Sequence, residues 1–167
     1  SAMATPARLP HVTTSAWGSA HEVLRLHTRG EVQFVDLTEE IAGLVRRHHL
    51  QAGLVNVQTR HTTTAVVVNE HEPLLLEDFR RALQRVAPRL AGYAHDDSRR
   101  RRVAPGERVN GHAHCQALLL PTHAALNVAG GELCLGRWQR VFFVELDGGQ
   151  AREVSVTLMG EMGSPWP

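Results

Sequence analysis

The chain has 167 residues, of which 43% are hydrophobic and 21% charged, as expected for one globular domain. Its net charge of +1 and aromatic content of 5% argue against a nucleic-acid partner or an anionic membrane. No apolar run approaches the ~20 residues that a membrane span needs, and no segment resembles a signal peptide. We expect one cytoplasmic domain over residues 19–167, preceded by a tag remnant and a loose lead-in at residues 1–18.

The first half of the chain alternates between strand and helix patterns. Alternating polarity predicts strands at 21–28 and 31–37, joined as a hairpin through Arg29-Gly30. A helix is expected from Thr38, a good N-cap, because glutamates follow it and basic residues fill its last turn. Two more strands are predicted at 54–59 and 62–69.

A second helix is expected to begin at Pro73, a residue that suits the first helical turn. Its predicted buried face consists of apolar residues spaced three and four apart, namely Leu75, Phe79, Leu83, Val86 and Leu90. The long segment 91–110 has no periodicity, and its arginine run, 99–102, is interpreted as a solvated loop surface rather than a phosphate grip.

The remaining elements are mostly strands. A short helix is predicted at 113–120, followed by strands at 125–128, 132–135, 140–146 and 152–158, with Asp147-Gly148-Gly149 as a hairpin turn. The whole order predicts an α+β fold with about eight mainly antiparallel strands and three helices. Cys115 and Cys134 lie in apolar surroundings and are expected to be buried free thiols.

Polar residues surround the apolar run of 64–68. His61-Thr62-Thr63-Thr64 precedes the run, and Asn69-Glu70 follows it. Because polar groups at the mouths of a strand often line a site, this segment is a candidate for chemistry. The alternative is an ordinary strand end, with surface histidine and threonines and a turn that starts at Asn69.

Two further segments carry groups capable of chemistry. In Asn110-Gly111-His112-Ala113-His114, the two histidines lie about 200° apart if the segment is helical, so only one could face a site. A solvated helix start is the plainer interpretation. Glu145 and Asp147 share one face of a strand end and could bind a cation or share a proton, although Asp147 alone fits a turn cap.

Taken in order, these segments resemble the YjbQ family (UPF0047, called secondary thiamine-phosphate synthase enzyme). The matching residues are His61-Thr62-Thr63-Thr64, Asn69-Glu70, Asp78, His95, Asn110 with His114, Leu135-Gly136-Arg137-Trp138-Gln139 and Asp147-Gly148. The resemblance covers about residues 20–160. It implies an α+β sandwich that assembles as a homotrimer and a thiamine-phosphate synthase activity, which is secondary in the family. That reaction joins hydroxymethylpyrimidine diphosphate to thiazole phosphate and releases pyrophosphate.

The chain departs from the family pattern at several positions. Gln116 stands where a lysine is common, Leu120 where a glycine is common, and Arg137 where a small residue is common. Gly149-Gln150 replaces the usual Pro-Arg. The lost lysine and arginine bear on phosphate binding, for which Arg137 or Arg152 could compensate.

The resemblance leads to a set of expected site residues. His61, His95 and His114 would hold a divalent cation, with zinc the expected metal. Glu70, Asp78 and His114 would be catalytic, the two carboxylates serving as orienting or acid–base groups. The expected substrate-binding residues are His61, Thr62, Thr63, Asn69, Asn110, Gln139 and Asp147.

Two other functions fit the same residues. One is a metal-assisted hydrolase of a small phosphorylated metabolite, which would release phosphate without a thiazole acceptor. The other is a non-catalytic ligand-binding trimer, in which binding would tolerate loss of Glu70 and Asp78.

Overall fold

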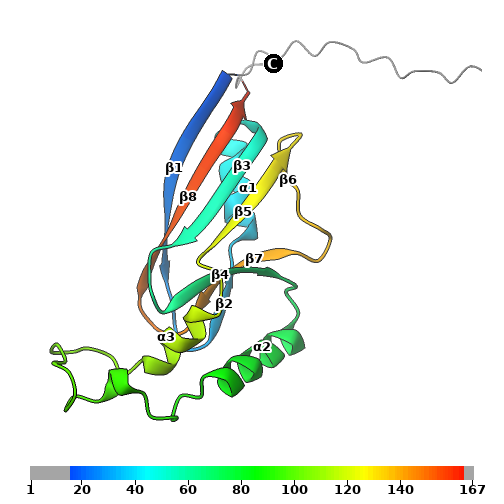
Figure 1. Cartoon of the computed structure of the whole chain (residues 1–167). Helices are drawn as coiled ribbons and strands as arrows, with labels where there is room; N and C mark the ends of the chain where they lie inside the picture. The colour runs from blue at the N-terminus through cyan, green and yellow to red at the C-terminus, as the bar shows by residue number, and fades with distance from the viewer. Residues whose placement is uncertain (1–15, 164–167) are drawn as a thin grey trace, which may run out of the picture.

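The structure is a computed structural model that describes residues 16–163 and contains two antiparallel sheets (Figure 1). The five-stranded sheet has the order β1-β8-β3-β5-β6, and the three-stranded sheet has the order β2-β7-β4. The larger sheet consists of β1 (Ala16–His27), β8 (Ala151–Met162), β3 (Leu50–Thr59), β5 (His123–Ala129) and β6 (Glu132–Leu133). The smaller sheet consists of β2 (Gln33–Asp36), β7 (Arg140–Glu145) and β4 (Thr64–Asn69).

Three α-helices accompany the sheets: α1 (Thr38–Arg47), α2 (Pro73–Val86) and α3 (Gly111–Leu118). A short 3₁₀ turn, η1 (Ala94–Asp96), lies in the long segment before α3. Figure 1 shows α1 against one face of the larger sheet, and α2 and α3 gathered at the end where β4 and β7 lie. The predicted α+β class, with three helices and antiparallel sheets, is confirmed.

The smaller sheet is buried on both faces. Phe143 of β7 belongs to the main core, together with Ile41 of α1 and Val156 of β8. Its neighbour Phe142 points to the opposite face and joins a second apolar cluster under α2 and α3. Because successive residues of a strand point to opposite faces, β7 needs apolar residues at nearly every position. This double burial explains why 141–144 is a continuous apolar run.

Both predicted hairpins are wrong, because the chain changes sheets at each turn. β1 pairs with β8, whereas β2 pairs with β7. The 147–149 turn likewise leaves the smaller sheet and enters the larger one. Here the chain passes very close to the segment after β1. A Cβ at Gly148 would lie 2.3 Å from the Gly30 oxygen, and one at Gly149 would lie 2.3 Å from the Thr28 oxygen. Glycine is therefore required at this crossing.

Thr38 is not the N-cap that the sequence predicted, because it is the first residue of α1 and Leu37 holds the cap position. Asp36 caps the turn instead, since its Oδ1 accepts hydrogen bonds from the Thr38 backbone N–H at 3.0 Å and hydroxyl at 2.6 Å. The Thr38 Oγ1 also accepts from the Val141 N–H at 2.9 Å. Thr38 thus joins α1 to β7.

Helix α2 begins at Pro73, as predicted, but its buried face is shorter than expected. The helix ends at Val86, and Val86 and Leu90 are 58% and 93% exposed. Leu76 is the buried apolar residue of the first turns. The end precedes Pro88, and proline disfavours a helical conformation in the residue before it.

Three smaller expectations also change. Cys115 and Cys134 are free thiols, but both are exposed rather than buried. β1 begins at Ala16, so residues 16–18 belong to the first strand and not to a loose lead-in. The tag remnant and the rest of the lead-in fall within 1–15, outside the described residues.

No helix within residues 16–163 is long and apolar enough to cross a membrane.

Candidate functional site

The predicted site residues divide between the two ends of the paired strands β4 and β7. Thr64 pairs with Glu145 at one end, and Asn69 pairs with Arg140 at the other. A strand rises about 3.3 Å per residue, so the two ends lie about 17 Å apart. Near the Thr64 end are His61, Thr62, Thr63, His95, Asn110, His114 and Asp147. Near the Asn69 end are Asn69, Glu70 and Gln139.

A buried ion-pair cluster at the Thr64 end consists of Thr28, Thr63, Glu145 and Arg152. The Arg152 guanidinium donates to both carboxylate oxygens of Glu145, at 2.7 and 2.6 Å. Thr28 Oγ1 also donates to Glu145 at 2.6 Å, and Arg152 donates to Thr63 Oγ1 at 2.9 Å. Burial alone would raise the pKa of Glu145, but the hydrogen bonds from Arg152 and Thr28 outweigh it and hold the pKa below its usual value. The cluster joins the two sheets. Its contacts engage the Arg152 guanidinium, which is therefore not available to a ligand.

The Asp147 carboxylate contacts Asn110 and Arg108 rather than the Glu145 carboxylate. Its Oδ2 accepts from Asn110 Nδ2 at 2.7 Å, and its Oδ1 accepts from Arg108 Nε at 3.0 Å. Asp147 is 2% exposed, so these donors offset the cost of burying its carboxylate. Asn110 directly precedes α3, and its contact with Asp147 fixes the start of the helix that carries His114. Within residues 16–163, the buried Asn110 Oδ1 has no hydrogen-bond partner.

A pocket of about 530 Å³, lined mainly by residues with polar side chains, opens between the β3–β4 turn and α3. We call it the histidine pocket. It is lined by Gln58, Thr59, Arg60, His61, Thr62, Thr64, His114, Ala117, Leu118 and Thr122. Thr59 and Thr64 hydrogen-bond each other, and Thr64 also donates to the His61 carbonyl at 3.1 Å. These two hydroxyls therefore stabilise the turn, whereas the exposed Thr62 is available to a ligand.

His114 lines the histidine pocket from α3. Its imidazole packs edge-on against His95, with ring centroids 4.9 Å apart. Partial burial lowers the pKa of His114, and the neighbouring His95 lowers it further. Neither ring nitrogen of His114 has a hydrogen-bond partner in the described part of the chain. His112, in contrast, is 2% exposed and faces Glu31 at 3.4 Å. Only one histidine of the pair therefore faces the pocket, as a helical segment predicts.

His61 lies in the same pocket but is already bonded. Its Nε2 accepts the Glu153 backbone N–H at 2.8 Å. The pKa of His61 is lowered by burial and then by the nearby Arg152. A neutral imidazole that accepts through one nitrogen carries its proton on the other, so His61 has no free lone pair for a metal.

The three predicted metal ligands do not fit a cation in this arrangement. His95 and His114 are in contact, but His61 would have to release the Glu153 N–H before it could coordinate. In addition, Arg101 places its guanidinium 3.4 Å from His95 Nε2. No group of three or more metal-binding side chains is found among residues 16–163. The structure therefore does not bring the expected ligand set together within one chain.

The Asn69 end forms a different surface. A pocket of about 400 Å³ there is lined by Asp36, Glu70, His71, Pro73, Arg137, Trp138 and Arg140. Arg137 stacks over the Trp138 ring at 4.7 Å. Gln139 accepts the Gly136 N–H at 2.8 Å, and Asn69 accepts the Glu70 N–H at 2.8 Å. Arg137 is thus at the opposite end from His114 and does not add charge to the histidine pocket.

Asp78 lies at neither end. It sits on α2 with 65% of its side chain exposed, and its nearest charge is Arg81 at 3.8 Å.

Two residues that line the histidine pocket, Arg60 and Thr122, were not predicted as site residues from the sequence. Thr122 reaches it because the Thr59 N–H donates to the Thr122 carbonyl at 3.0 Å, a long-range contact that has no local sequence signal.

Comparison with known proteins identifies the family. Residues 22–161 match the family described as UPF0047 protein YjbQ-like. The chain belongs to the YjbQ-like UPF0047 family. A UPF0047 protein of Archaeoglobus fulgidus is 39% identical over 135 residues, covering 80% of this chain and 96% of the relative. One from Methanothermobacter thermautotrophicus is 33% identical over 138 residues, covering 83% and 90%.

Solved structures agree with this assignment. The chain is similar to a YbjQ-like protein of unknown function from Sulfolobus solfataricus, with a TM-score of 0.78 and 27% identity. That match covers 87% of this chain and 100% of the other. A hypothetical protein from Aeropyrum pernix gives a TM-score of 0.74 at 30% identity, covering 87% and 99%. The expected family is therefore correct.

Proposed function

We propose that this UPF0047 protein is an enzyme acting on a small phosphorylated metabolite in the histidine pocket, with a thiamine-phosphate synthase-type transfer as the reaction. The observation that carries the proposal is His114, a partly buried imidazole with a lowered pKa and no bonded partner among residues 16–163. A titratable group in a pocket whose pKa is shifted by burial and by a neighbouring group marks a candidate site.

Arg60 and Thr62 are the groups available to a phosphate. Arg60 lines the pocket, although it contacts Glu153 at 2.8 Å with an exposed side chain. An exposed ion pair of this kind is weak, so a phosphate can compete for the guanidinium. Arg152 and Arg108 are engaged with Glu145 and Asp147. The sequence contains no lysine, so only arginines can supply permanent positive charge.

In this transfer the thiazole nitrogen forms a bond to the pyrimidine methylene carbon, while the bond from that carbon to the diphosphate oxygen breaks. Pyrophosphate leaves with the bonding electron pair. A bound pyrophosphate would raise the pKa of the adjacent His114, because negative charge favours the imidazolium. His114 can then donate a proton to the departing pyrophosphate.

Hydrolysis is a second candidate, favoured by the lowered pKa of His114. A neutral imidazole at pH 7 accepts a proton, which suits activation of a water molecule against a phosphate ester. The two reactions predict opposite pH dependences. If His114 acts as a base, kcat/KM rises as pH increases through its lowered pKa. If His114 acts as an acid, the rate falls over that range.

The test is to incubate the protein with hydroxymethylpyrimidine diphosphate, with and without thiazole phosphate, and to identify the products. Thiamine phosphate and pyrophosphate formed only with the acceptor support the transfer. Phosphate released without the acceptor supports hydrolysis. If the substrate binds without turnover, the protein is a ligand-binding protein rather than an enzyme for this substrate. If the substrate neither binds nor reacts, the choice of substrate is wrong.

A divalent cation bound by His61, His95 and His114 is proposed only for the assembled oligomer. Within one chain, the hydrogen bond from the Glu153 N–H to His61 Nε2 opposes coordination by His61. Zinc content should be measured for the wild type, His61→Ala and His114→Ala. Stoichiometric zinc lost in both variants would support the three-histidine site. Zinc lost only in His114→Ala would exclude His61 as a ligand.

We further propose a homotrimer in which the histidine pocket and the Asn69 end of neighbouring copies meet. The support is geometric, because about 17 Å separates Thr64 from Asn69 along β4 in one chain. One small substrate could reach both ends only across a contact between copies. Light scattering during gel filtration should give three times the chain mass of 18.4 kDa. A monomer at micromolar concentration would reject the assembly.

We also propose a cytoplasmic location. Cys115 and Cys134 are exposed free thiols, and such residues are typical of a reducing compartment.

A further inference from the structure

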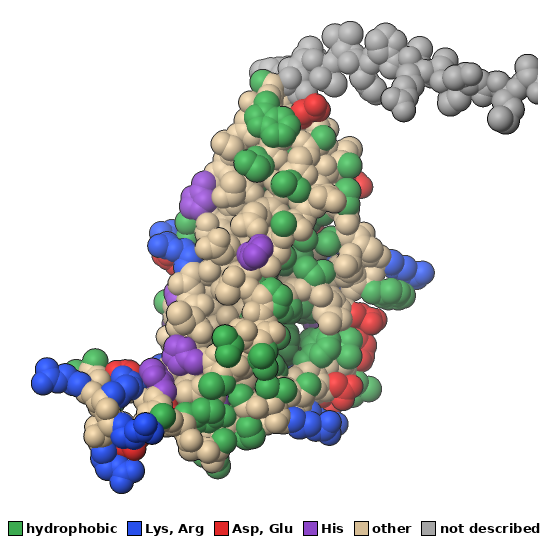
Figure 2. All heavy atoms as spheres, in the orientation of Figure 1, with side chains coloured by type: hydrophobic (Ala, Val, Ile, Leu, Met, Phe, Trp, Pro, Cys, Tyr) green, Lys and Arg blue, Asp and Glu red, His purple; other side chains and the backbone are tan. Residues whose placement is uncertain are grey.

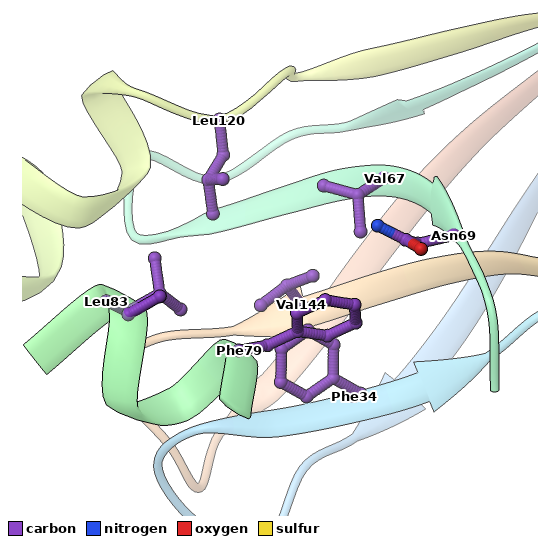
Figure 3. Close-up of a pocket in the computed structure, with 8 residues that line it drawn as sticks. Phe34, Val67, Asn69, Phe79, Leu83, Leu120 and Val144 are labelled. Atoms are coloured by element: carbon purple, nitrogen blue, oxygen red, sulfur yellow. The ribbon is translucent and has the colours of Figure 1, made fainter. Parts of the chain in front are cut away.

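An apolar pocket lies between α2 and the outer face of the three-stranded sheet (Figure 3). Its volume is about 190 Å³. It is lined by Phe34, Val67, Asn69, Phe79, Ala82, Leu83, Leu120 and Val144. Asn69 is the only polar side chain among these described lining residues. None of them lines the histidine pocket, so the two pockets are separate.

Polar contacts hold α2 over this space. Arg80 Nε donates to the Val32 carbonyl at 2.8 Å. At the other end of the helix, Gln116 Nε2 of α3 donates to the Ala87 carbonyl at 3.1 Å. These contacts tie α2 to the segment before β2 and to α3 through polar groups that do not line the pocket.

The shape and lining of the pocket select a planar ring. A dry apolar cavity of about 150 Å³ is known to accept benzene, so this pocket has room for one ring with a small substituent. Phe34 and Phe79 form one wall, with their ring centroids 5.7 Å apart and inclined at 48°. Aromatic rings pack favourably at edge-to-face and offset angles, and these two rings offer such surfaces to a third ring.

Asn69 adds a single polar requirement. Its Oδ1 accepts the Glu70 N–H at 2.8 Å, which assigns the amide orientation. Figure 3 shows the Asn69 nitrogen directed toward the pocket. Asn69 is an exposed residue at the end of β4, and its Nδ2 has no protein partner among residues 16–163. An amide nitrogen at the edge of an apolar pocket would donate to an acceptor atom on the ligand.

We propose that this pocket binds a small aromatic compound that carries one hydrogen-bond acceptor, with the ring against Phe34 and Phe79 and the acceptor at Asn69 Nδ2. The site is separate from the histidine pocket of the same chain, and it shares Asn69 with the end of β4 that the proposed trimer brings near a neighbouring histidine pocket. It adds a second small-molecule site to the chain.

The test uses benzonitrile, a ring with an acceptor, and toluene, a ring of similar size without one. Each is titrated into ¹⁵N-labelled full-length protein, and the backbone amides of Val67 and Leu83 are followed by NMR. Both probes should shift these amides. Asn69→Leu should weaken benzonitrile binding by about 2–12-fold, the loss of one hydrogen bond, and leave toluene binding unchanged.

Ala82→Phe should weaken both probes at least tenfold, because a phenyl group would fill the space. Ala82 is exposed, so Ala82→Phe is compatible with folding. If Ala82→Phe does not fold, Ala82→Leu places a smaller side chain in the same space. Glu77→Phe is the matched control, because it adds the same group at a side chain that is 57% exposed and does not line the pocket. It should leave both affinities unchanged.

Three results would overturn the proposal. The first is the absence of shifts at Val67 and Leu83 with either probe. The second is equal binding by the wild type and Ala82→Phe. The third is dissociation of an oligomer by Ala82→Phe but not by Glu77→Phe in light scattering, which would make a second copy of the chain the occupant.

Discussion

The buried ion-pair cluster and the histidine pocket lie at the same end of β4 but treat their polar groups in opposite ways. In the cluster, the carboxylate of Glu145 receives three side-chain hydrogen bonds and one from the backbone of Asp147. In the pocket, His114 has no bonded partner within the described residues. Complete satisfaction of buried polar groups fixes structure, whereas an unpaired titratable group remains free to act on a ligand.

The space-filling view extends this contrast to the surface. Figure 2 shows histidine side chains near the foot of the molecule, next to a projecting group of arginines. The loop that holds Arg99–Arg102 projects there in Figure 1. Within it, Arg101 binds Glu107 and the His95 carbonyl, while Arg100 and Arg102 are exposed. The arginine run is thus largely a solvated loop surface, as predicted, with one arginine that supports the position of His95.

The largest expected effect comes from opening the buried ion-pair cluster. Arg152→Met should lower the free energy of unfolding by about 3–5 kcal/mol, because it leaves Glu145 buried without its charge partner. Urea denaturation followed by circular dichroism measures the loss. Arg25→Met is the control, since Arg25 is 79% exposed and 3.7 Å from Glu153, and should cost at most about 1 kcal/mol. Equal losses would contradict the role of the cluster.

The next largest effect should separate activity from stability. His114→Gln should reduce turnover of the pyrimidine substrate by about 10²–10⁴-fold, the usual range for a lost acid–base group. Its unfolding free energy should stay close to that of the wild type, because the His114 ring makes no hydrogen bond to the described residues. His27→Gln is the control, as His27 is an exposed residue at the end of β1. Unchanged turnover in His114→Gln would remove this residue from the mechanism.

Acid should weaken the cluster selectively. The pKa of Glu145 is lower in the folded protein than in the unfolded chain, so its stabilising contribution is complete above the unfolded value of about 4.3. That contribution is lost as pH falls through the folded pKa. The unfolding free energy of the wild type should therefore fall more steeply below pH ~4 than that of Glu145→Gln. Denaturation curves between about pH 3 and 6 compare the slopes, and parallel slopes would contradict the assignment.

The smallest effect should come from Asp78. Asp78→Ala is expected to change turnover by less than about twofold, because exposed ion pairs contribute little and Asp78 is at neither end of β4. Steady-state kinetics beside His114→Gln would measure it. A loss comparable to that of His114→Gln would show that α2 of one chain serves the site of another.

Much of the fold follows from local patterns, but its pairing does not. The period of α2 and its start at Pro73 are readable from the sequence, as is the apolar run of β7. The sheet change at 147–149 cannot be read from the sequence. A glycine-rich turn has the same sequence pattern whether the following strand pairs with the preceding strand or enters another sheet. Only the close approach of Gly148 to Gly30 distinguishes the two.

The candidate site divides in the same way. The helical spacing of His112 and His114 correctly indicated that one of them faces away. The bond between His61 and the Glu153 backbone joins residues 92 positions apart, so no local signal could reveal it. The same holds for the partnership of Arg152 with Thr63, 89 positions away, which removes Arg152 from the set of possible phosphate ligands.

The most direct test of the central claim is the pKa of His114, measured by NMR on histidine-labelled protein and assigned by the signal that disappears in His114→Gln. We predict a pKa below the ordinary value of about 6.5 in the free protein, and a rise when inorganic pyrophosphate is added. A pKa at or above that ordinary value and insensitive to pyrophosphate would contradict a free, reactive imidazole in a phosphate-binding pocket.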